Sequence, residues 1–144
     1  MTIEETNLLF KDICGRLRSG LICSIYREDD EGFGWRDAEC KGYFQNNDSY
    51  EFYFEDVIAI DNIERLKPYL RPMSSMTEEE KIELCIRAYA PDEMKTIDEK
   101  LYVIQTNAKN ATDFYNEHHL DYRGLIPMGL ALEAPEGMYN IKTK

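Results

Sequence analysis

Two adjacent histidines near the carboxyl-terminal end are the side chains best suited to chemistry in this sequence. His118 and His119 are the only histidines of the chain, and Asp121 follows them closely. An imidazole beside a carboxylate could act as a general acid or base, or could bind a metal. However, neighbouring side chains on a helix point about 100° apart, and the spacing matches no H-x-x-x-H or H-E-x-x-H motif. A small hydrolase or nuclease that uses His118 and His119 with carboxylates is therefore the alternative hypothesis.

A structural role explains the same tail, residues 118–140, more simply. A histidine in the last turn of a helix is favoured by the helix dipole, and Asp121 can accept backbone N–H groups in a following turn. Arg123 can pair with Asp121 or with a carboxylate elsewhere. The tail also has four aliphatic side chains that we expect to dock on a sheet: Leu125, Ile126, Leu130 and Leu132. We therefore predict that the tail is a folded structural segment and not an active site.

Other catalytic and metal-binding patterns are missing from the sequence. It contains no G-x-S-x-G elbow, no phosphate-binding loop and no G-x-G-x-x-G motif. The four cysteines are widely spaced and form no C-x-x-C pair: Cys14, Cys23, Cys40 and Cys85. We expect four free thiols, with Cys14 and Cys85 on the buried faces of helices, and we expect no metal and no cofactor.

Composition points to one folded, acidic domain. The chain has 144 residues, of which 43% are hydrophobic, and a formal net charge of -11. This charge opposes direct binding to a nucleic-acid backbone, which needs clustered Lys and Arg. The first residues, MTIEETNLLFKDICGRL, do not resemble a signal peptide, and no run of residues is apolar enough to span a membrane. We expect a cytoplasmic protein with no membrane partner.

Hydrophobic periodicity predicts helices at both ends of a strand-rich middle. An apolar stripe that includes Leu9 and Ile13 indicates a helix over residues 3–17. Three segments are typical of strands and their turns: GLICSIY, WRDAECKGYF and YEFYFEDVIAI. Thr77 and Glu80 form a capping box before a helix that is predicted to about Ala90, with a stripe of Ile82, Cys85, Ile86 and Tyr89. A further helix is predicted from Asn107 to about residue 118.

The predicted fold is therefore α+β. Residues 1–144 should form a single domain with a small antiparallel sheet, a meander that can curl, flanked by about three helices. The segment LYVIQ, residues 101–105, is compatible with a strand or a helix.

The aromatic-rich middle of the chain suggests binding. Exposed Tyr and Trp side chains make good contacts with proteins, bases and small ligands, although aromatic side chains can also simply fill the core. The candidate binding residues are Trp35, Tyr43, Tyr53 and Arg123. The leading hypothesis is a small non-enzymatic protein that acts by occupying a protein or small-ligand partner.

Three stretches of the sequence resemble one protein family. They are LLFKDICGRLRSGLICSIY, LKPYLRPMSSMTEEE and HHLDYRGLIPMGLALEAPEGMY. They are similar to a family of small uncharacterised proteins encoded by gut Bacteroidales bacteria, their prophages and other mobile elements. The chain departs from the family pattern at Leu120, where an aromatic residue is usual. The resemblance implies a cytoplasmic bacterial or phage protein and no particular activity or cofactor. Under the leading hypothesis, such an accessory protein has a host-defence or regulatory role among its options.

Overall fold

A computed structural model describes residues 1–29, 32–45, 50–55, 58–88 and 108–139 of the chain. Six strands form one open sheet in the order β4-β3-β2-β1-β5-β6. Their bounds are β1 Ile22–Asp29, β2 Gly32–Gln45, β3 Tyr50–Phe54, β4 Ile58–Ile60, β5 Leu66–Leu70 and β6 Leu132–Glu133. The first four strands are an antiparallel meander, β5 pairs antiparallel with the other side of β1, and β6 adds to β5 in parallel. The predicted α+β domain with a small, mostly antiparallel sheet is confirmed.

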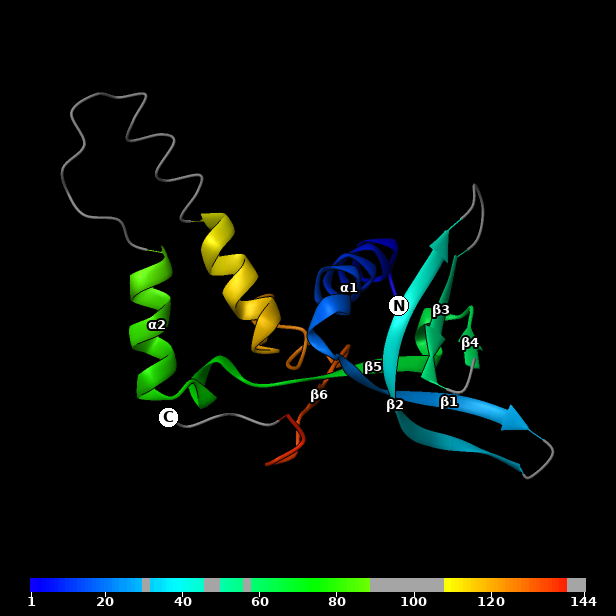
Figure 1. Cartoon of the computed structure of the whole chain (residues 1–144). Helices are drawn as coiled ribbons and strands as arrows, with labels where there is room; N and C mark the ends of the chain where they lie inside the picture. The colour runs from blue at the N-terminus through cyan, green and yellow to red at the C-terminus, as the bar shows by residue number, and fades with distance from the viewer. Residues whose placement is uncertain (30–31, 46–49, 56–57, 89–107, 140–144) are drawn as a thin grey trace.

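Helix α1 (Ile3–Arg16) covers one face of the sheet (Figure 1). It begins at the N-cap Thr2, whose side chain accepts a hydrogen bond from the Glu5 N–H. Its stripe is buried as predicted, because Leu9 and Ile13 have no exposed surface and pack in the main core. A 3-10 turn (Leu17–Ser19) and a left-handed glycine, Gly20, then lead into β1.

Two further helices lie side by side away from the sheet (Figure 1). They are α2 (Glu78–Ala88) and a helix over residues 108–117, drawn in yellow. The Arg87 guanidinium on α2 donates to Glu117 over 2.8 and 3.2 Å, and the Asn110 amide donates to the Arg87 carbonyl over 2.9 Å. These contacts hold the two helices together. Tyr89, Ala90 and the segment 101–105 lie outside the described residues.

The capping box of α2 is confirmed, but the predicted burial of Cys85 on its apolar stripe is wrong. The Thr77 hydroxyl accepts from the Glu80 N–H over 3.1 Å, and the Glu80 carboxylate accepts from the Thr77 N–H over 2.9 Å. Ile82 and Ile86 are 61% and 75% exposed, and Cys85 is exposed as well. The helix turns its other side inward, because buried Glu80 pairs with Arg71. Cys14, the other cysteine predicted to be buried on a helix, is only half-buried.

The tail docks on the sheet as predicted. Leu125 and Leu130 are buried in the core, Ile126 packs against it while partly exposed, and β6 contains Leu132. The Arg71 N–H donates to the His119 carbonyl over 2.7 Å, and the Asp121 N–H donates to the Arg71 carbonyl over 2.8 Å. The chain after β5 is therefore bound to the tail by main-chain hydrogen bonds. Two other 3-10 turns, Ile63–Arg65 and Met73–Ser75, flank β5.

Candidate functional site, an acidic cleft between helices and sheet

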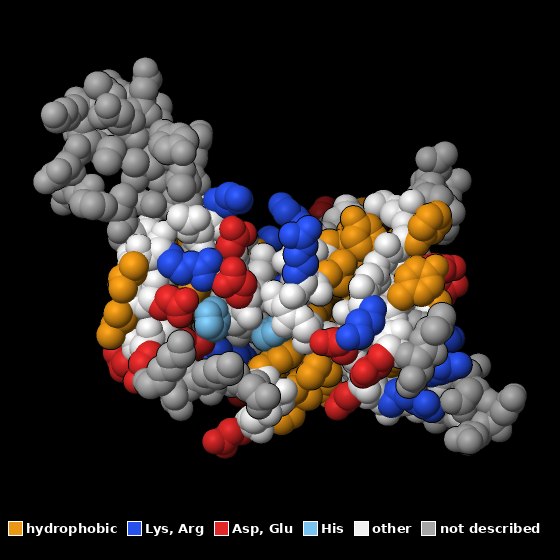
Figure 2. Space-filling view, in the orientation of Figure 1, with side chains coloured by type: hydrophobic (Ala, Val, Ile, Leu, Met, Phe, Trp, Pro, Cys, Tyr) orange, Lys and Arg blue, Asp and Glu red, His pale blue; other side chains and the backbone are white. Residues whose placement is uncertain are grey.

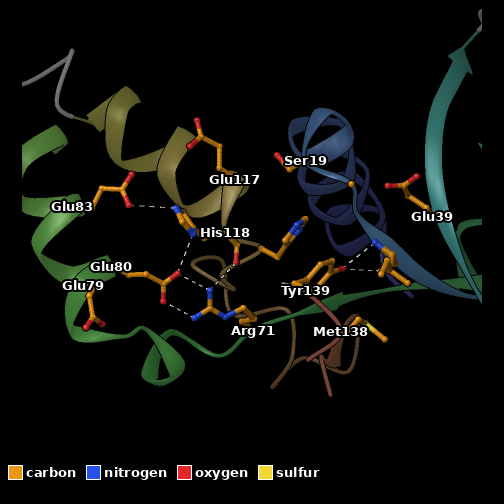
Figure 3. Close-up of a pocket in the computed structure, with 13 residues that line it drawn as sticks. Ser19, Glu39, Arg71, Glu79, Glu80, Glu83, Glu117, His118, Met138 and Tyr139 are labelled. Carbon is orange, nitrogen blue, oxygen red and sulfur yellow. Dashed lines mark hydrogen bonds and ion pairs between the residues drawn. The ribbon is translucent and has the colours of Figure 1, made fainter. Parts of the chain in front are cut away.

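A cleft of about 710 Å³ lies where the helix pair meets the sheet and the tail. Figure 2 shows red acidic side chains gathered around the pale blue histidines on this face. Three parts of the chain line the cleft: α2 with the end of helix 108–117, the tail, and the start of the sheet (Figure 3). Residues far apart in the sequence therefore meet at one hollow.

A buried ion pair between Arg71 and Glu80 forms part of the lining. The two guanidinium NH₂ groups donate to the two carboxylate oxygens over 2.7 and 2.8 Å, and both side chains are 6% exposed (Figure 3). Arg71 also donates to the carbonyls of Ser75 and His118 over 3.1 and 3.3 Å. The hydrogen bonds from Arg71, followed by those from Thr77, lower the pKa of Glu80 to about 2 although burial opposes this. Glu80 is therefore ionised at any pH at which the protein would normally work.

His118 lies against this ion pair with one side open to the cleft. Its Nδ1 is 3.0 Å from Glu80 Oε2, and its Nε2 is 3.9 Å from Glu83 Oε2 (Figure 3). The ring also packs on Phe114, with centroids 4.3 Å apart. Carboxylates on α2 thus hold the imidazole at the end of helix 108–117.

His119 has a different environment, because the helix ends at residue 117 and the backbone becomes left-handed at His119. The His119 N–H donates to Asn116 and the Leu120 N–H donates to Tyr115, which is the hydrogen-bond pattern of a Schellman motif. His119 takes the left-handed position of this motif, with φ of 58°, where glycine is the usual residue. Its ring is buried and stacks on Tyr139, with centroids 3.7 Å apart. Burial, and then the positive charge of Arg16, lower the pKa of His119 to about 4, so the ring is neutral at pH 7.

Tyr139 stacks on the His119 ring and is hydrogen-bonded to the sheet. Its hydroxyl accepts from the Ile22 N–H over 3.0 Å and lies 2.8 Å from the Tyr69 carbonyl, to which it can donate. The pairing of β1 with β5 starts one residue later, at Cys23 and Pro68. The hydroxyl therefore bridges the place where these two strands separate, and burial raises the pKa of Tyr139.

The lining of the cleft is strongly acidic. Five glutamates and a single arginine line it, together with the two histidines: Glu39, Glu79, Glu80, Glu83, Glu117 and Arg71. Arg87 partly neutralises Glu117, whose pKa it lowers, and Lys41 pairs with Glu39. Together with Arg71, which pairs with Glu80, these two cations leave an excess of two carboxylates, so the electrostatic potential in the cleft favours a positively charged occupant.

The structure places both candidate histidines in this cleft but does not bring Asp121 to them. Asp121 is not among the lining residues, and its two oxygens accept from the N–H groups of Leu125 and Ile126 over 2.7 and 3.0 Å. This is the turn-stabilising role predicted from the sequence. His118 and His119 contact different partners, as expected of adjacent residues at a helix end.

The four predicted binding residues do not form one site. Trp35 and Tyr43 are both about half exposed, but they lie eight positions apart in β2, at most roughly 26 Å along an extended chain. Tyr43 contacts Phe10 of α1, whereas Tyr53 donates a hydrogen bond to Glu51 over 2.7 Å. Arg123 pairs with buried Asp12 over 3.1 Å, which is the second of its two predicted pairings.

Sequence reasoning missed most of the cleft. Arg71, Glu83, Glu117 and Tyr139 were not candidates, and Glu80 was predicted only as part of a helix cap. No local pattern identifies them, because Arg71 is 47 positions from His118, and Tyr139 is 117 positions from Ile22. The only available signal was the concentration of glutamates around the capping box.

Within the described ranges, no group of three or more His, Cys, Asp or Glu side chains is arranged to hold a metal ion. Nor does this part of the chain contain a helix both long and apolar enough to cross a membrane. Comparison with protein-family models, with curated proteins and with solved structures finds no match. The cleft itself is therefore the basis for a functional proposal.

Proposed function

We propose that the protein is a small non-enzymatic binding protein that holds a positively charged group of its partner in the acidic cleft. The observation that supports this is the lining of the cleft, which contains five glutamates and one arginine. The volume of about 710 Å³ is in the range of ordinary ligand sites. Such a site attracts a cation by its field and fixes it by hydrogen bonds to carboxylate oxygens.

The resemblance of the chain to mobile-element proteins extends this proposal. A phage or mobile-element accessory protein of the bacterial cytoplasm would use the cleft to occupy a basic site on a host protein. Recovery of the tagged protein from its host, followed by mass spectrometry of what it retains, tests this part of the proposal. Membrane proteins or nucleic acids as the main retained species would contradict it.

Binding of spermidine, a linear triamine, tests the cleft directly. In calorimetry at low ionic strength, the native protein should bind it with an affinity that falls as salt is added. The double variant Glu79→Gln, Glu83→Gln should bind at least about tenfold more weakly, since it loses two charge-assisted contacts. The matched control is Glu4→Gln with Asp61→Asn, which removes two exposed acids outside the cleft. Equal affinities of the two double variants would contradict the proposal.

One observation favours a second candidate, an acid–base hydrolase or nuclease. Glu80 is 3.0 Å from His118 Nδ1, as in enzymes where a carboxylate orients a catalytic imidazole. However, Glu80 already accepts two hydrogen bonds from Arg71, which reduces its effect on the imidazole. The variant His118→Gln separates the hypotheses, because an enzyme would lose all turnover, while the binding protein should keep most of its affinity for spermidine.

A further inference from the structure

The outer part of the β1–β2 hairpin is a ribbon of only two strands. Among the described strands, β5 pairs with β1 only at residues 23–25, and β3 pairs with β2 only from Cys40 onward. Residues 26–29 and 32–35 therefore pair with each other alone, and this ribbon projects beyond the rest of the sheet (Figure 1). Two strands by themselves are marginally stable in water, whereas three or more with a hydrophobic face can be stable. A further strand beside the ribbon would therefore stabilise it.

Residues 32–38 of β2 form the free edge of the ribbon, and their main-chain groups face outward at every second position. The Cys40 N–H donates over 2.8 Å to the carbonyl just before β1, whereas the Glu39 N–H donates over 3.0 Å to the Glu55 carboxylate on the opposite side of β2. The register with β1 is unbroken from residue 32 to residue 39. Since the direction alternates along a strand, the N–H and C=O groups of residues 33, 35 and 37 point away from β1. These groups have no strand beside them among the described residues.

The free edge lacks most of the features that keep edge strands from pairing with other chains. Such features include lysine, proline and β-bulges, but residues 32–38 contain neither lysine nor proline, and their register with β1 shows no bulge. Trp35, at the centre of the edge, is 50% exposed, and its ring contacts that of Tyr26 on β1 with centroids 5.5 Å apart. The edge thus offers main-chain hydrogen bonds and an exposed aromatic side chain at the same place.

The sequence of the free edge is complementary to itself. In an antiparallel pair of free edges related by a two-fold axis at Trp35, the main chain of Trp35 hydrogen-bonds to that of its own equivalent, and residue 33 hydrogen-bonds to residue 37 of the other copy. Arg36 then lies opposite Gly34, so no like charges are directly opposite each other. An axis at Arg36 or at Asp37 would place that residue opposite its own equivalent, and like charges in this position are destabilising. We infer that the protein forms a symmetric dimer in which the free edges of two copies pair with Trp35 at the axis.

The dimer joins β1 and β2 of each copy into one four-stranded sheet. Trp35 and Tyr26 are directly opposite each other in the β1–β2 pair, so the two copies together form a row of four aromatic rings across the dimer. An edge of this length is small beside the roughly 1,600 Å² of a standard interface, so the dimer is weak and depends on protein concentration. This inference goes beyond the proposed function and does not depend on it, because Trp35 does not line the acidic cleft.

Sedimentation velocity at increasing protein concentration tests the dimer. In about 0.15 M salt, charge repulsion between copies of net charge -11 is screened beyond roughly 8 Å, and the native protein should form a dimer by about 1 mM. Trp35→Lys places like charges opposite each other at the axis and should weaken the dimer about tenfold. The control is Phe44→Lys, which changes a similarly exposed aromatic residue in the part of β2 that pairs with β3. A native protein that stays monomeric would overturn the inference and leave the free edge to an extended segment of another protein. Equal dimerisation of the two variants would overturn it as well.

Disulfide cross-linking tests the register of the dimer, in proteins that also carry Cys85→Ser to remove the exposed native thiol. A Cβ added at Gly34 meets no atom within 4 Å, and Arg36 is exposed, so a cysteine fits at either position. Because the inferred register puts residue 34 of one copy opposite residue 36 of the other, an oxidised mixture of Gly34→Cys and Arg36→Cys should give a cross-linked dimer with one chain of each. Neither variant should cross-link readily by itself, since its two cysteines lie at diagonal positions roughly 7–8 Å apart. The absence of a cross-link in the mixture, or a faster cross-link within either variant alone, would contradict the inferred dimer.

Discussion

Arg16 and Arg71 are two buried arginines that stabilise the end of helix 108–117. Arg16 pairs with Asp12 over 2.9 and 3.0 Å, and both side chains are fully buried. It donates to the Tyr115 carbonyl in the last turn of the helix over 3.4 Å and to the Leu120 carbonyl just beyond it over 2.7 Å. Arg71 donates to the His118 carbonyl. The last carbonyls of a helix have no partner within it, so the two guanidinium groups satisfy them. At the scale of the residue, the buried charges of this protein fix the position of the segment that carries both histidines.

The lowered pKa of His119 predicts a loss of stability in mild acid. Its pKa is about 4 in the folded protein, against about 6.5 for a free histidine. As the pH falls below 6.5, the unfolded chain takes up a proton that the buried ring does not, so the free energy of unfolding decreases until about pH 4. The full effect is roughly 3 kcal/mol. Urea unfolding at pH 7, 5.5 and 4 should show this decrease in the native protein and a smaller one in His119→Phe.

Glu80 provides the control for this prediction at lower pH. Its folded pKa of about 2 is below the value of an unpaired glutamate, so its contribution to stability is present above about pH 4.5 and is lost as the pH falls towards 2. The native protein and His119→Phe should therefore lose stability in parallel below pH 4. Parallel curves between pH 7 and 4 as well would show that His119 titrates normally.

The start of α2 depends on its capping box. Thr77→Ala removes the oxygen that accepts from the Glu80 N–H, and it should lower the free energy of unfolding by about 1 kcal/mol. Denaturant unfolding measures the change, with Ser74→Ala, an exposed serine in the preceding 3-10 turn, as the control. A loss of less than a few tenths of a kcal/mol would mean that the carboxylate of Glu80 alone is enough to start the helix.

The tail contributes to stability through its buried aliphatic residues, but not equally. Leu125 has no exposed surface, whereas Ile126 is only partly buried against the core. Leu125→Ala should therefore cost about 2–5 kcal/mol, the usual range for a buried leucine, and Ile126→Ala should cost less. Denaturant unfolding of the two variants gives the ranking. An equal or larger loss at Ile126 would contradict the observed packing of the tail.

The architecture of the whole molecule was predictable where the signals are local. The stripe of Leu9 and Ile13, the Thr77 cap and the alternating strands each depend on residues within a few positions, and all three are confirmed. The buried face of α2 was not predictable from the sequence. The apolar stripe favours burial of Ile82 and Ile86, but the ion pair between Glu80 and Arg71 turns the opposite face inward. The cleft was not predictable either, because its lining comes from distant parts of the chain. It exists only because the tail pairs with β5 and brings Tyr139 to β1.

The reactivity of the four thiols tests the packing of the whole molecule. Cys85 is exposed, whereas Cys23 and Cys40 have almost no accessible surface, and burial raises the pKa values of Cys14 and Cys40 to about 11 and that of Cys23 as well. The thiolate is the reactive form, so half-buried Cys14 reacts slowly because of its raised pKa, and buried Cys23 and Cys40 react only when the structure opens. With Ellman's reagent at pH 8, the native protein should release one rapid equivalent, from Cys85, and react slowly thereafter.

Denaturant supplies the other half of the thiol test. Unfolded protein that has not been reduced should react at all four positions, since all four cysteines are free in the structure. The slow native phase should accelerate with urea in proportion to the unfolded population, because the reagent reaches fully buried Cys23 only through global opening. A Cys85→Ser variant should lose the rapid phase and keep the slow one. Any rapid equivalent in this variant would mean that the core formed by α1, β1 and β2 opens far more readily than its packing predicts. Only two reactive thiols in the denatured native sequence would mean that a disulfide had formed.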